Sequence, residues 1–157
     1  MIERRYTWKY GHGGVSAQVA GEVIKKIEDR DGEVTRESFL EESRPANSPT
    51  HKCFDWNDTE AAEKWRLHQA GQIIRDIQVE IIEDEKEPAK VPVFINTTPH
   101  GIRNEAKYKS VEIAVQDDEG YTVILDNAKR EMRLFKKKYS MLKELRNVFA
   151  EIDKVIG

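Results

Sequence analysis

The chain has 157 residues, which is enough for one hydrophobic core and too few for two full domains. Charged residues make up 35% and hydrophobic residues 38%, with a formal net charge of −3, a balance typical of a helix-rich protein with a small core. No apolar run approaches the roughly 20 residues of a membrane span, and no secretory signal opens the chain, so we expect a cytoplasmic protein with no membrane partner.

Residues 1–15 are predicted to form an N-terminal arm, a short strand or extended segment that ends in a glycine-rich turn. No phosphate-binding glycine pattern follows this turn, so it does not indicate a nucleotide site. Ser16 is the expected N-cap of a first helix that ends at Asp31-Gly32. Its apolar face is formed by Val19, Ala20, Val23, Ile24 and Ile27.

Two further helices are expected before the pattern changes. Thr35 can cap a short second helix that carries Phe39 and Leu40 and stops before Pro45. The third helix is expected to begin at Asn57, with Glu60 completing a capping box. Its apolar residues spread over more than one face, which predicts the central helix of the body.

After Arg75 the hydrophobic period becomes that of strands. Two strands, around Val79–Ile81 and Val91–Ile95, flank a polar turn over residues 83–90. Three helices followed by a two-stranded β-hairpin is the order of a winged-helix domain, although an unrelated α+β unit would have the same order. We therefore expect a winged-helix-like domain over residues 16–97, followed by a connector over residues 98–116.

A long amphipathic helix is expected over residues 117–157, capped by Asp117 or Asp118. Its apolar positions step by three or four residues nearly throughout, which is typical of a seam that packs on another helix. Two successive steps of three, at Leu142 and Leu145, favour docking on the body or a bent dimer helix over a regular coiled coil. The fold class expected overall is α+β and mostly helical.

Charge is distributed unevenly along the chain. Residues 128–157 hold nine basic and four acidic residues, a net charge of +5, which leaves −8 on the first 127 residues. This split predicts an acidic body with a basic helix, and a polyanion would meet the helix first. The basic cluster consists of Arg130, Arg133, Lys136, Lys137 and Lys138.

The run from Asn47 to Arg66 has an elaborate pattern: Ser-Pro-x-His, an aromatic residue, an acid, Trp, a polar residue, Asp and Ala-Ala-Glu. This run resembles a motif of small proteins encoded by bacteriophages and prophages. The stretches 61–75 and 133–145 are also similar to that family, with Gly71 where the family has Arg. The resemblance covers most of residues 16–156. It implies a phage or prophage accessory protein in a bacterial host cell and brings no catalytic residues.

Catalytic and metal chemistry have weak support in the sequence. His51, Cys53 and Asp55 form the only local group with suitable metal-binding atoms, and no second cysteine or matched histidine pair completes it. Cys53 as a nucleophile would need a base such as His51, His68 or His100 held beside it. A lone cysteine beside Phe54 is more often a small buried residue. We expect no enzymatic activity, no metal and no cofactor.

Two surfaces are candidates for nucleic acid. In a winged helix, the third helix would enter a major groove, with Lys64, Arg66 and Arg75 as contacts. The acidic turn Glu83-Asp-Glu-Lys-Glu87 opposes this arrangement, because phosphate would repel it. The basic cluster is the better candidate, and its alternative interpretation is a solvated face that keeps the helix soluble or pairs with the acidic body.

Two functions follow as hypotheses. The first is a non-enzymatic protein associated with nucleic acid, either DNA-binding or regulatory. The second is a protein-interaction module, in which the C-terminal helix forms a homodimer or the acidic body and that helix bind a host or phage protein. The first is favoured, because the order of elements and the basic cluster agree on it.

Overall fold

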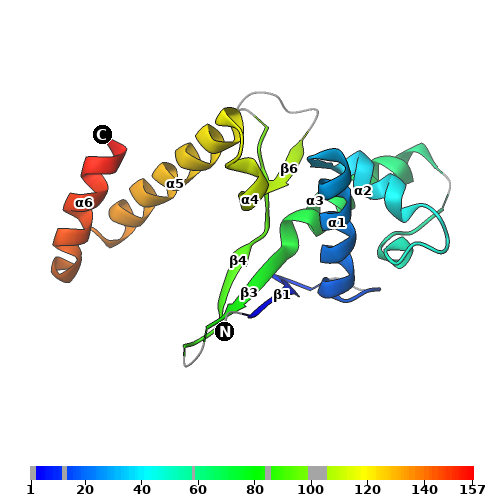
Figure 1. Ribbon diagram of the computed structural model, residues 1–157, viewed down its shortest axis with the longest axis horizontal. Coiled ribbons are helices and arrows are strands. Elements are labelled where there is room, and N and C mark those ends of the chain that lie inside the picture. Colours follow the sequence, from blue (N-terminus) through cyan, green and yellow to red (C-terminus); the bar gives the residue numbers. More distant parts are fainter. Residues whose placement is uncertain (1–2, 12–13, 58, 84–85, 99–105) are drawn as a thin grey trace. The chain divides into compact units, whose positions relative to one another are not determined.

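The structure is a computed structural model that describes residues 3–11, 14–57, 59–83, 86–98 and 106–157. It is a mixed α+β fold dominated by helices, as the sequence predicts (Figure 1). Its strands form two small antiparallel sheets, whereas the sequence predicts a single β-hairpin. The chain divides into two compact units, a first unit of residues Met1–Ile113 and a second unit of residues Ala114–Gly157.

The first unit holds the helices that form the core and both sheets. In chain order its elements are β1 (Glu3–Trp8), α1 (Ala17–Asp31), β2 (Val34–Thr35), α2 (Arg36–Ser43), the 3-10 turn η1 (His51–Cys53), α3 (Glu60–Asp76), β3 (Ile77–Ile82), β4 (Ala89–Pro92), β5 (Phe94–Asn96) and β6 (Lys107–Ser110), and the short helix α4 (Val111–Ala114) ends at the boundary.

The first two helices begin where the sequence predicts. The Ser16 hydroxyl accepts a hydrogen bond from the Val19 amide at 3.2 Å, and α1 ends at Gly32, whose φ of 79° is the left-handed conformation that glycine adopts without strain. Thr35 caps α2 and forms a reciprocal capping box with Ser38. Helix α2 stops at Ser43, before Pro45, as expected.

The third helix begins two residues later than predicted. Thr59, not Asn57, is the N-cap of α3, and its hydroxyl accepts from the Ala62 amide at 3.1 Å. The predicted capping box between Asn57 and Glu60 is therefore wrong. The backbone carbonyl of Asn57 has another role, because it accepts hydrogen bonds from the Thr59 amide and from the Arg66 guanidinium.

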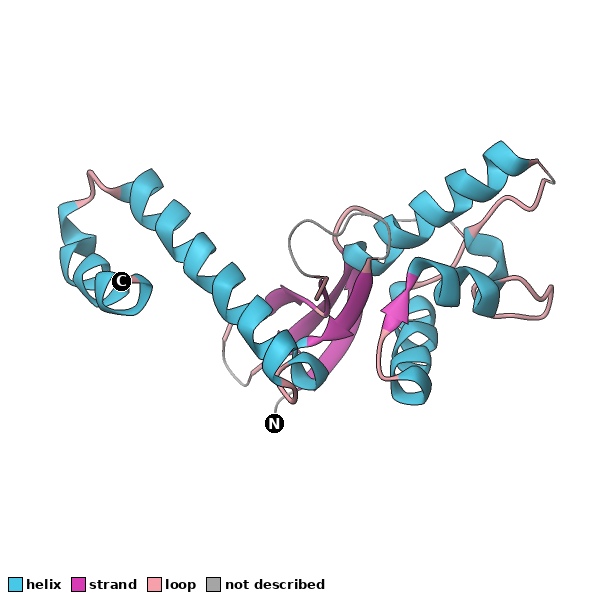
Figure 2. Cartoon of the chain, turned by 90° about the horizontal axis from the view of Figure 1, so that it is seen from above, coloured by secondary structure: helices cyan, strands magenta, loops and turns pink. Residues whose placement is uncertain are grey.

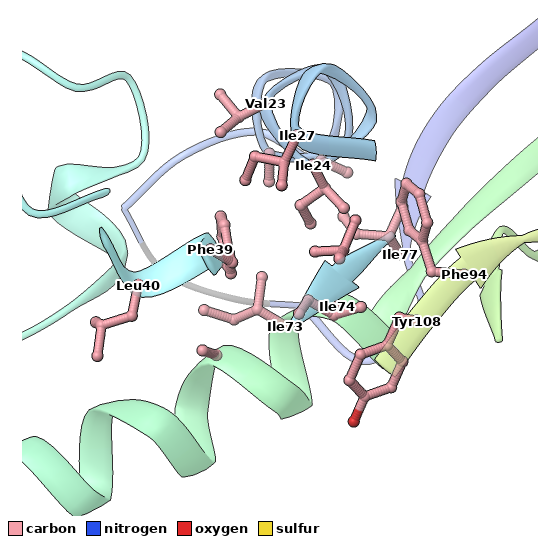
Figure 3. Packing of buried hydrophobic residues seen from close by; sticks show 14 of the residues in the cluster. Val23, Ile24, Ile27, Phe39, Leu40, Ile73, Ile74, Ile77, Phe94 and Tyr108 are labelled. Atoms are coloured by element: carbon pink, nitrogen blue, oxygen red, sulfur yellow. The ribbon is translucent and has the colours of Figure 1, made fainter. Parts of the chain in front are cut away.

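The core lies between the three helices and the strands that follow them. Figure 3 shows Val23, Ile24 and Ile27 of α1 facing Ile73 and Ile74 of α3. Phe39 and Leu40 of α2, Ile77 of β3, Phe94 of β5 and Tyr108 of β6 close the rest of this cluster. Burial of these side chains supplies the main driving force for folding of the first unit.

The first sheet has the order β1-β3-β4, and both of its pairings are antiparallel. Strand β1 pairs along β3 from Glu3↔Ile82 to Trp8↔Ile77, so the segment predicted as an arm is part of the body. The Tyr6 ring lies against α1 at Gly21, where an added Cβ would come within 2.4 Å of that ring. Glycine at this position therefore allows β1 to approach the helix.

The second sheet has the order β2-β6-β5, also antiparallel. Thr35 of β2 is level with Lys107 of β6, and Phe94 of β5 is level with Ser110. Strand β6 falls within the predicted connector 98–116, so these residues belong to the body instead. Part of that segment, residues 99–105, lies outside the described residues, as do residues 84–85 of the predicted polar turn.

The second unit consists of helices. Asp117 caps α5 (Asp118–Tyr139), and its carboxylate accepts from the Gly120 amide at 2.7 Å, as predicted. The single helix expected over residues 117–157 is interrupted, because Leu142 is extended with φ −84° and ψ 104°. The 3-10 turn η2 (Lys143–Leu145) then leads into α6 (Arg146–Ile156). Figure 2 shows α6 turning back from the C-terminal end of α5.

Candidate nucleic-acid interface

The basic cluster lies in the C-terminal half of α5. Lys136, Lys137 and Lys138 occupy its last turn, where the negative end of the helix dipole favours cations. Arg130, Arg133 and Lys137 are separated by three and four residues, so they share one face of the helix. All three side chains are exposed. This exposed face has the spacing and charge needed to contact successive phosphates.

Part of the basic cluster has partners within the second unit. Lys136 forms an ion pair with Asp153 of α6, and the Arg133 guanidinium donates to the Ile156 carbonyl at 3.3 Å. The Lys138 ammonium lies 5.0 Å from the centre of the Tyr139 ring. Lys137 is exposed and forms no ion pair within the described ranges of the chain. Lys136 and Arg133 therefore join the two helices, whereas Lys137 and Lys138 remain turned toward solvent.

The three candidate contacts on α3 are not all at the surface. Lys64 is exposed, as a contact would require. Arg66 is only 3% exposed, so its predicted role as a nucleic-acid contact is wrong. Arg75 is exposed and donates a hydrogen bond to the Tyr108 hydroxyl at 3.0 Å. Over its described residues, helix α3 thus presents separate cations and no continuous basic face.

Arg66 instead ties the loop before α3 to the helix. Its guanidinium donates to the Asp55 carbonyl at 2.5 Å, to the Asn57 carbonyl, and to the Glu63 carboxylate at 2.7 Å. A planar guanidinium with five donors suits this fork of acceptors, and a lysine would not. Nothing in the sequence spacing alone separates a buried Arg66 from an exposed one.

Trp56 is the centre of the Asn47–Arg66 run. The His51 ring stacks on it, with ring centres 4.9 Å apart and an angle of 8° between the planes. The guanidinium groups of Arg66 and Arg44 lie 5.1 Å and 5.4 Å from the Trp56 ring centre, within the range of cation–π attraction. The Trp56 indole donates to the His51 carbonyl at 2.8 Å. The aromatic residues of the run therefore pack on one another and on two arginines.

The polar residues of the same run also bond to the end of α2 (Ser43 and its C-cap Arg44). The hydroxyls of Ser43 and Thr50 lie 2.7 Å apart, and His51 Nδ1 lies 3.0 Å from the Ser43 carbonyl. Hydrogen bonds from Arg44 and then Arg66 hold the pKa of the Glu63 carboxyl below its ordinary value. Arg44 forms ion pairs with Glu41 and Glu63. Nothing in the sequence around Arg44 predicts this role.

Cys53 has the environment of an inert thiol. Burial raises its pKa to about 11, so it is protonated at neutral pH, whereas a nucleophilic cysteine needs a lowered pKa. The nearby His51 ring is occupied by Trp56 and Ser43. Among the described residues, no group of three or more His, Cys, Asp and Glu side chains is placed to hold a metal ion.

A pocket of about 400 Å³ opens in the first unit between α1, the first sheet and the start of α4. Its walls are mainly apolar, including Val79, Ile81 and Val91. Its two cations already have carboxylate partners, because Lys25 pairs with Glu28 and Asp29, and Arg5 pairs with Glu80. The described residues that line the pocket therefore offer an apolar surface without a free cation that would anchor an anion.

Glu28 is a buried acid that reasoning from the sequence missed. It is 1% exposed, and its carboxylate accepts from the Lys25 ammonium at 2.8 Å and from the Ser110 amide at 2.5 Å. The bond to Ser110 joins α1 to the end of β6. The spacing of Glu28 from Ile24 and Ile27, on the apolar face of α1, is the signal that could have placed it inside.

These features define a mixed α+β protein with a compact three-helix first unit and a second unit of two helices that carries a basic cluster. Among the described residues, no helix combines the length and apolar character that crossing a membrane requires. Comparison with protein-family models, with curated proteins and with solved structures finds no match to this chain.

Proposed function

We propose that this chain is a non-enzymatic protein associated with nucleic acid, and that the basic cluster of α5 supplies most of its electrostatic affinity. The observation that carries the proposal is the exposed position of Arg130 and Lys137 on one side of α5, with Lys138 exposed beside them. Cations at such spacing bind phosphates without reading sequence, so affinity would be similar on different sequences and steeply dependent on salt.

A winged-helix-like first unit would position this helix. The order α1-β2-α2-α3, followed by antiparallel strands, supports that interpretation, and so does the pairing of β2 with the later strand β6. The acidic residues of the turn 83–87 would keep phosphate away from the end of the β3–β4 pair. Contacts are therefore assigned to α5, with Lys64 and Arg75 as the exposed candidates on α3.

The proposed setting is the cytoplasm of a bacterial host cell, where the protein would act as a phage or prophage accessory factor. This part of the proposal rests on the resemblance of the Asn47–Arg66 run to phage-encoded proteins. The contacts of the loop before α3 support a structural role for that run, because Trp56 stacks on His51 and lies beside the Arg66 guanidinium. The Asn47–Arg66 run would then stabilise the loop before α3, and the basic cluster would bind nucleic acid.

The second candidate is a protein-interaction module that binds a host or phage protein through its acidic body and C-terminal helices. The observation that favours it is the number of exposed apolar side chains in the second unit, among them Tyr121, Leu134 and Met141. Such residues commonly mark protein interfaces. This candidate predicts a defined protein complex with little affinity for nucleic acid.

The test is fluorescence polarisation with random duplex and single-stranded DNA over a salt series. The triple variant Arg130→Ser, Lys137→Ser and Lys138→Ser should weaken binding on all sequences alike and flatten the salt slope on duplex DNA by about 0.9 for each phosphate that is no longer neutralised. The matched control neutralises three exposed lysines of the first unit, Lys26, Lys52 and Lys90, and should keep the slope. No binding at low salt would overturn the proposal and favour the interaction module.

A further inference from the structure

The second unit leaves most of its large apolar side chains uncovered. Thirteen large hydrophobic residues are exposed among the described residues, and nine of them lie in the second unit. Within residues 114–157, all of which are described, the buried hydrophobic residues are only Ala114, Phe149 and Ile152. A unit of this size that buries so little apolar surface requires another surface for stability. The nine exposed residues are Val115, Tyr121, Leu125, Leu134, Phe135, Met141, Leu142, Val148 and Val155.

Helix α6 covers only part of the apolar seam of α5. The contacts that join the two helices involve the C-terminal part of α5, where Phe135 meets Phe149 at 6.2 Å between ring centres and Arg133 bonds Ile156 at the end of α6. The seam continues toward the N-terminus of α5 through Tyr121 and Leu125, which are 54% and 37% exposed. This N-terminal stretch is therefore left largely uncovered by the described residues of the second unit.

The charges of α5 divide at the middle of the helix. The N-terminal half carries Asp118, Glu119 and Asp126 and no basic residue. The C-terminal half carries six basic residues and one acid, Glu131. Two copies of α5 side by side in antiparallel orientation would bring the acidic half of each level with the basic half of the other. A parallel pair would place like charges together, and antiparallel helix dipoles also attract.

We infer that a second copy of this chain covers the seam, with the two α5 helices antiparallel and crossing at Ala128. Ala128 is exposed, lies on the seam and is small enough for a close helix crossing. In this register Tyr121 of one copy is level with Phe135 of the other, and Ile124 is level with Met132. The interface is isologous, since the same patch serves both copies about a two-fold axis.

The first unit is the other surface that could cover the seam, and it is less well matched. It contributes only four of the thirteen large hydrophobic residues that are exposed in the described part of the chain. Two of these, Tyr10 and Trp65, are separate from Val91 and Val111, which lie at the apolar pocket. A second α5 complements both the acidic and the basic half of the helix. The acidic first unit would complement the basic half only.

Sedimentation equilibrium of the full chain at micromolar concentration tests the dimer. We expect twice the chain mass of 18.2 kDa. Leu125→Glu, on the uncovered part of the seam, should shift the protein to the mass of one chain. Asn127→Glu adds the same charge a little more than half a turn of α5 away from Leu125, off the seam, and should leave the dimer intact. The cooperative urea transition of the first unit, followed by the fluorescence of its three tryptophans, should be unchanged in both variants, which separates loss of association from loss of folding.

Cysteine cross-linking tests the antiparallel orientation of the two α5 helices without changing the charges of α5. In a Cys53→Ser background, Ala128→Cys should form an intermolecular disulfide readily, because both copies approach at this residue. Tyr121→Cys should not, since about 21 Å along the axis separates the two copies of that residue in the antiparallel register. A one-chain mass for the unmodified protein would overturn the inference and favour docking on the first unit. Equal cross-linking at both positions would overturn the antiparallel register.

Discussion

At the scale of single residues, Arg66 is a polar side chain whose removal should be costly. It is buried, and its guanidinium satisfies two backbone carbonyls, those of Asp55 and Asn57, besides pairing with Glu63. Truncation would leave these acceptors without their donor and would remove the cation beside Trp56. We therefore expect Arg66→Ala to lower the free energy of unfolding by about 2–4 kcal/mol, measured by urea denaturation.

A charge-preserving substitution distinguishes a structural Arg66 from a nucleic-acid contact. Arg66→Lys keeps the positive charge but loses the planar fork, so we expect it to lose most of the same stability. Lys64→Ala, on the exposed side of the same helix, should stay within about 0.5 kcal/mol of the unmodified protein. If Arg66→Lys were as stable as the unmodified protein, the proposed fork of hydrogen bonds would not be the role of Arg66.

At the scale of elements, the start of α3 allows a direct comparison of two capping residues. The Thr59 side chain accepts from the Ala62 amide, whereas Asn57 accepts from Thr59 and Arg66 through its backbone carbonyl. Thr59→Ala should therefore cost about 1 kcal/mol of unfolding free energy, and Asn57→Ala should cost clearly less. The reverse order in urea denaturation would restore Asn57 as the cap.

Local signals were sufficient for most helix boundaries. Ser16, Thr35 and Asp117 cap helices where the sequence predicts, because a capping bond joins residues only two or three positions apart. The break near Leu142 is accompanied in the sequence by two short steps of the apolar seam, yet the period as a whole predicts a continuous helix. The turn after α5 allows Phe149 of α6 to contact Phe135 of α5. The spacing of apolar residues within one segment does not predict such a contact between helices.

Long-range contacts account for the strand pairings and site residues that could not be predicted. Strand β1 pairs with β3 from Glu3↔Ile82, and β2 pairs with β6 at Thr35↔Lys107, across separations that no short window spans. The basic cluster could be located from the positions of its basic residues in the sequence. The burial of Arg66 could not, because it depends on how the loop before α3 folds back over that helix.

At the scale of the whole molecule, stability is concentrated in the first unit. Every member of the main hydrophobic cluster lies between Ala17 and Tyr108. Among its described residues, the second unit buries only Phe149 and Ile152 as hydrophobic side chains beyond the boundary residue Ala114. Because apolar burial dominates folding free energy, the two units should differ greatly in their ability to fold alone.

The chain cut after Ile113 should therefore fold by itself. We expect it to keep a cooperative urea transition with a midpoint near that of the full chain, followed by tryptophan fluorescence, because all three tryptophans (Trp8, Trp56 and Trp65) lie in the first unit. Residues 114–157 alone should show little helix at low concentration and gain helix as concentration rises, since an antiparallel pair must form before the seam is covered. A first unit that loses its cooperative transition when residues 114–157 are removed would show that the second unit completes its core.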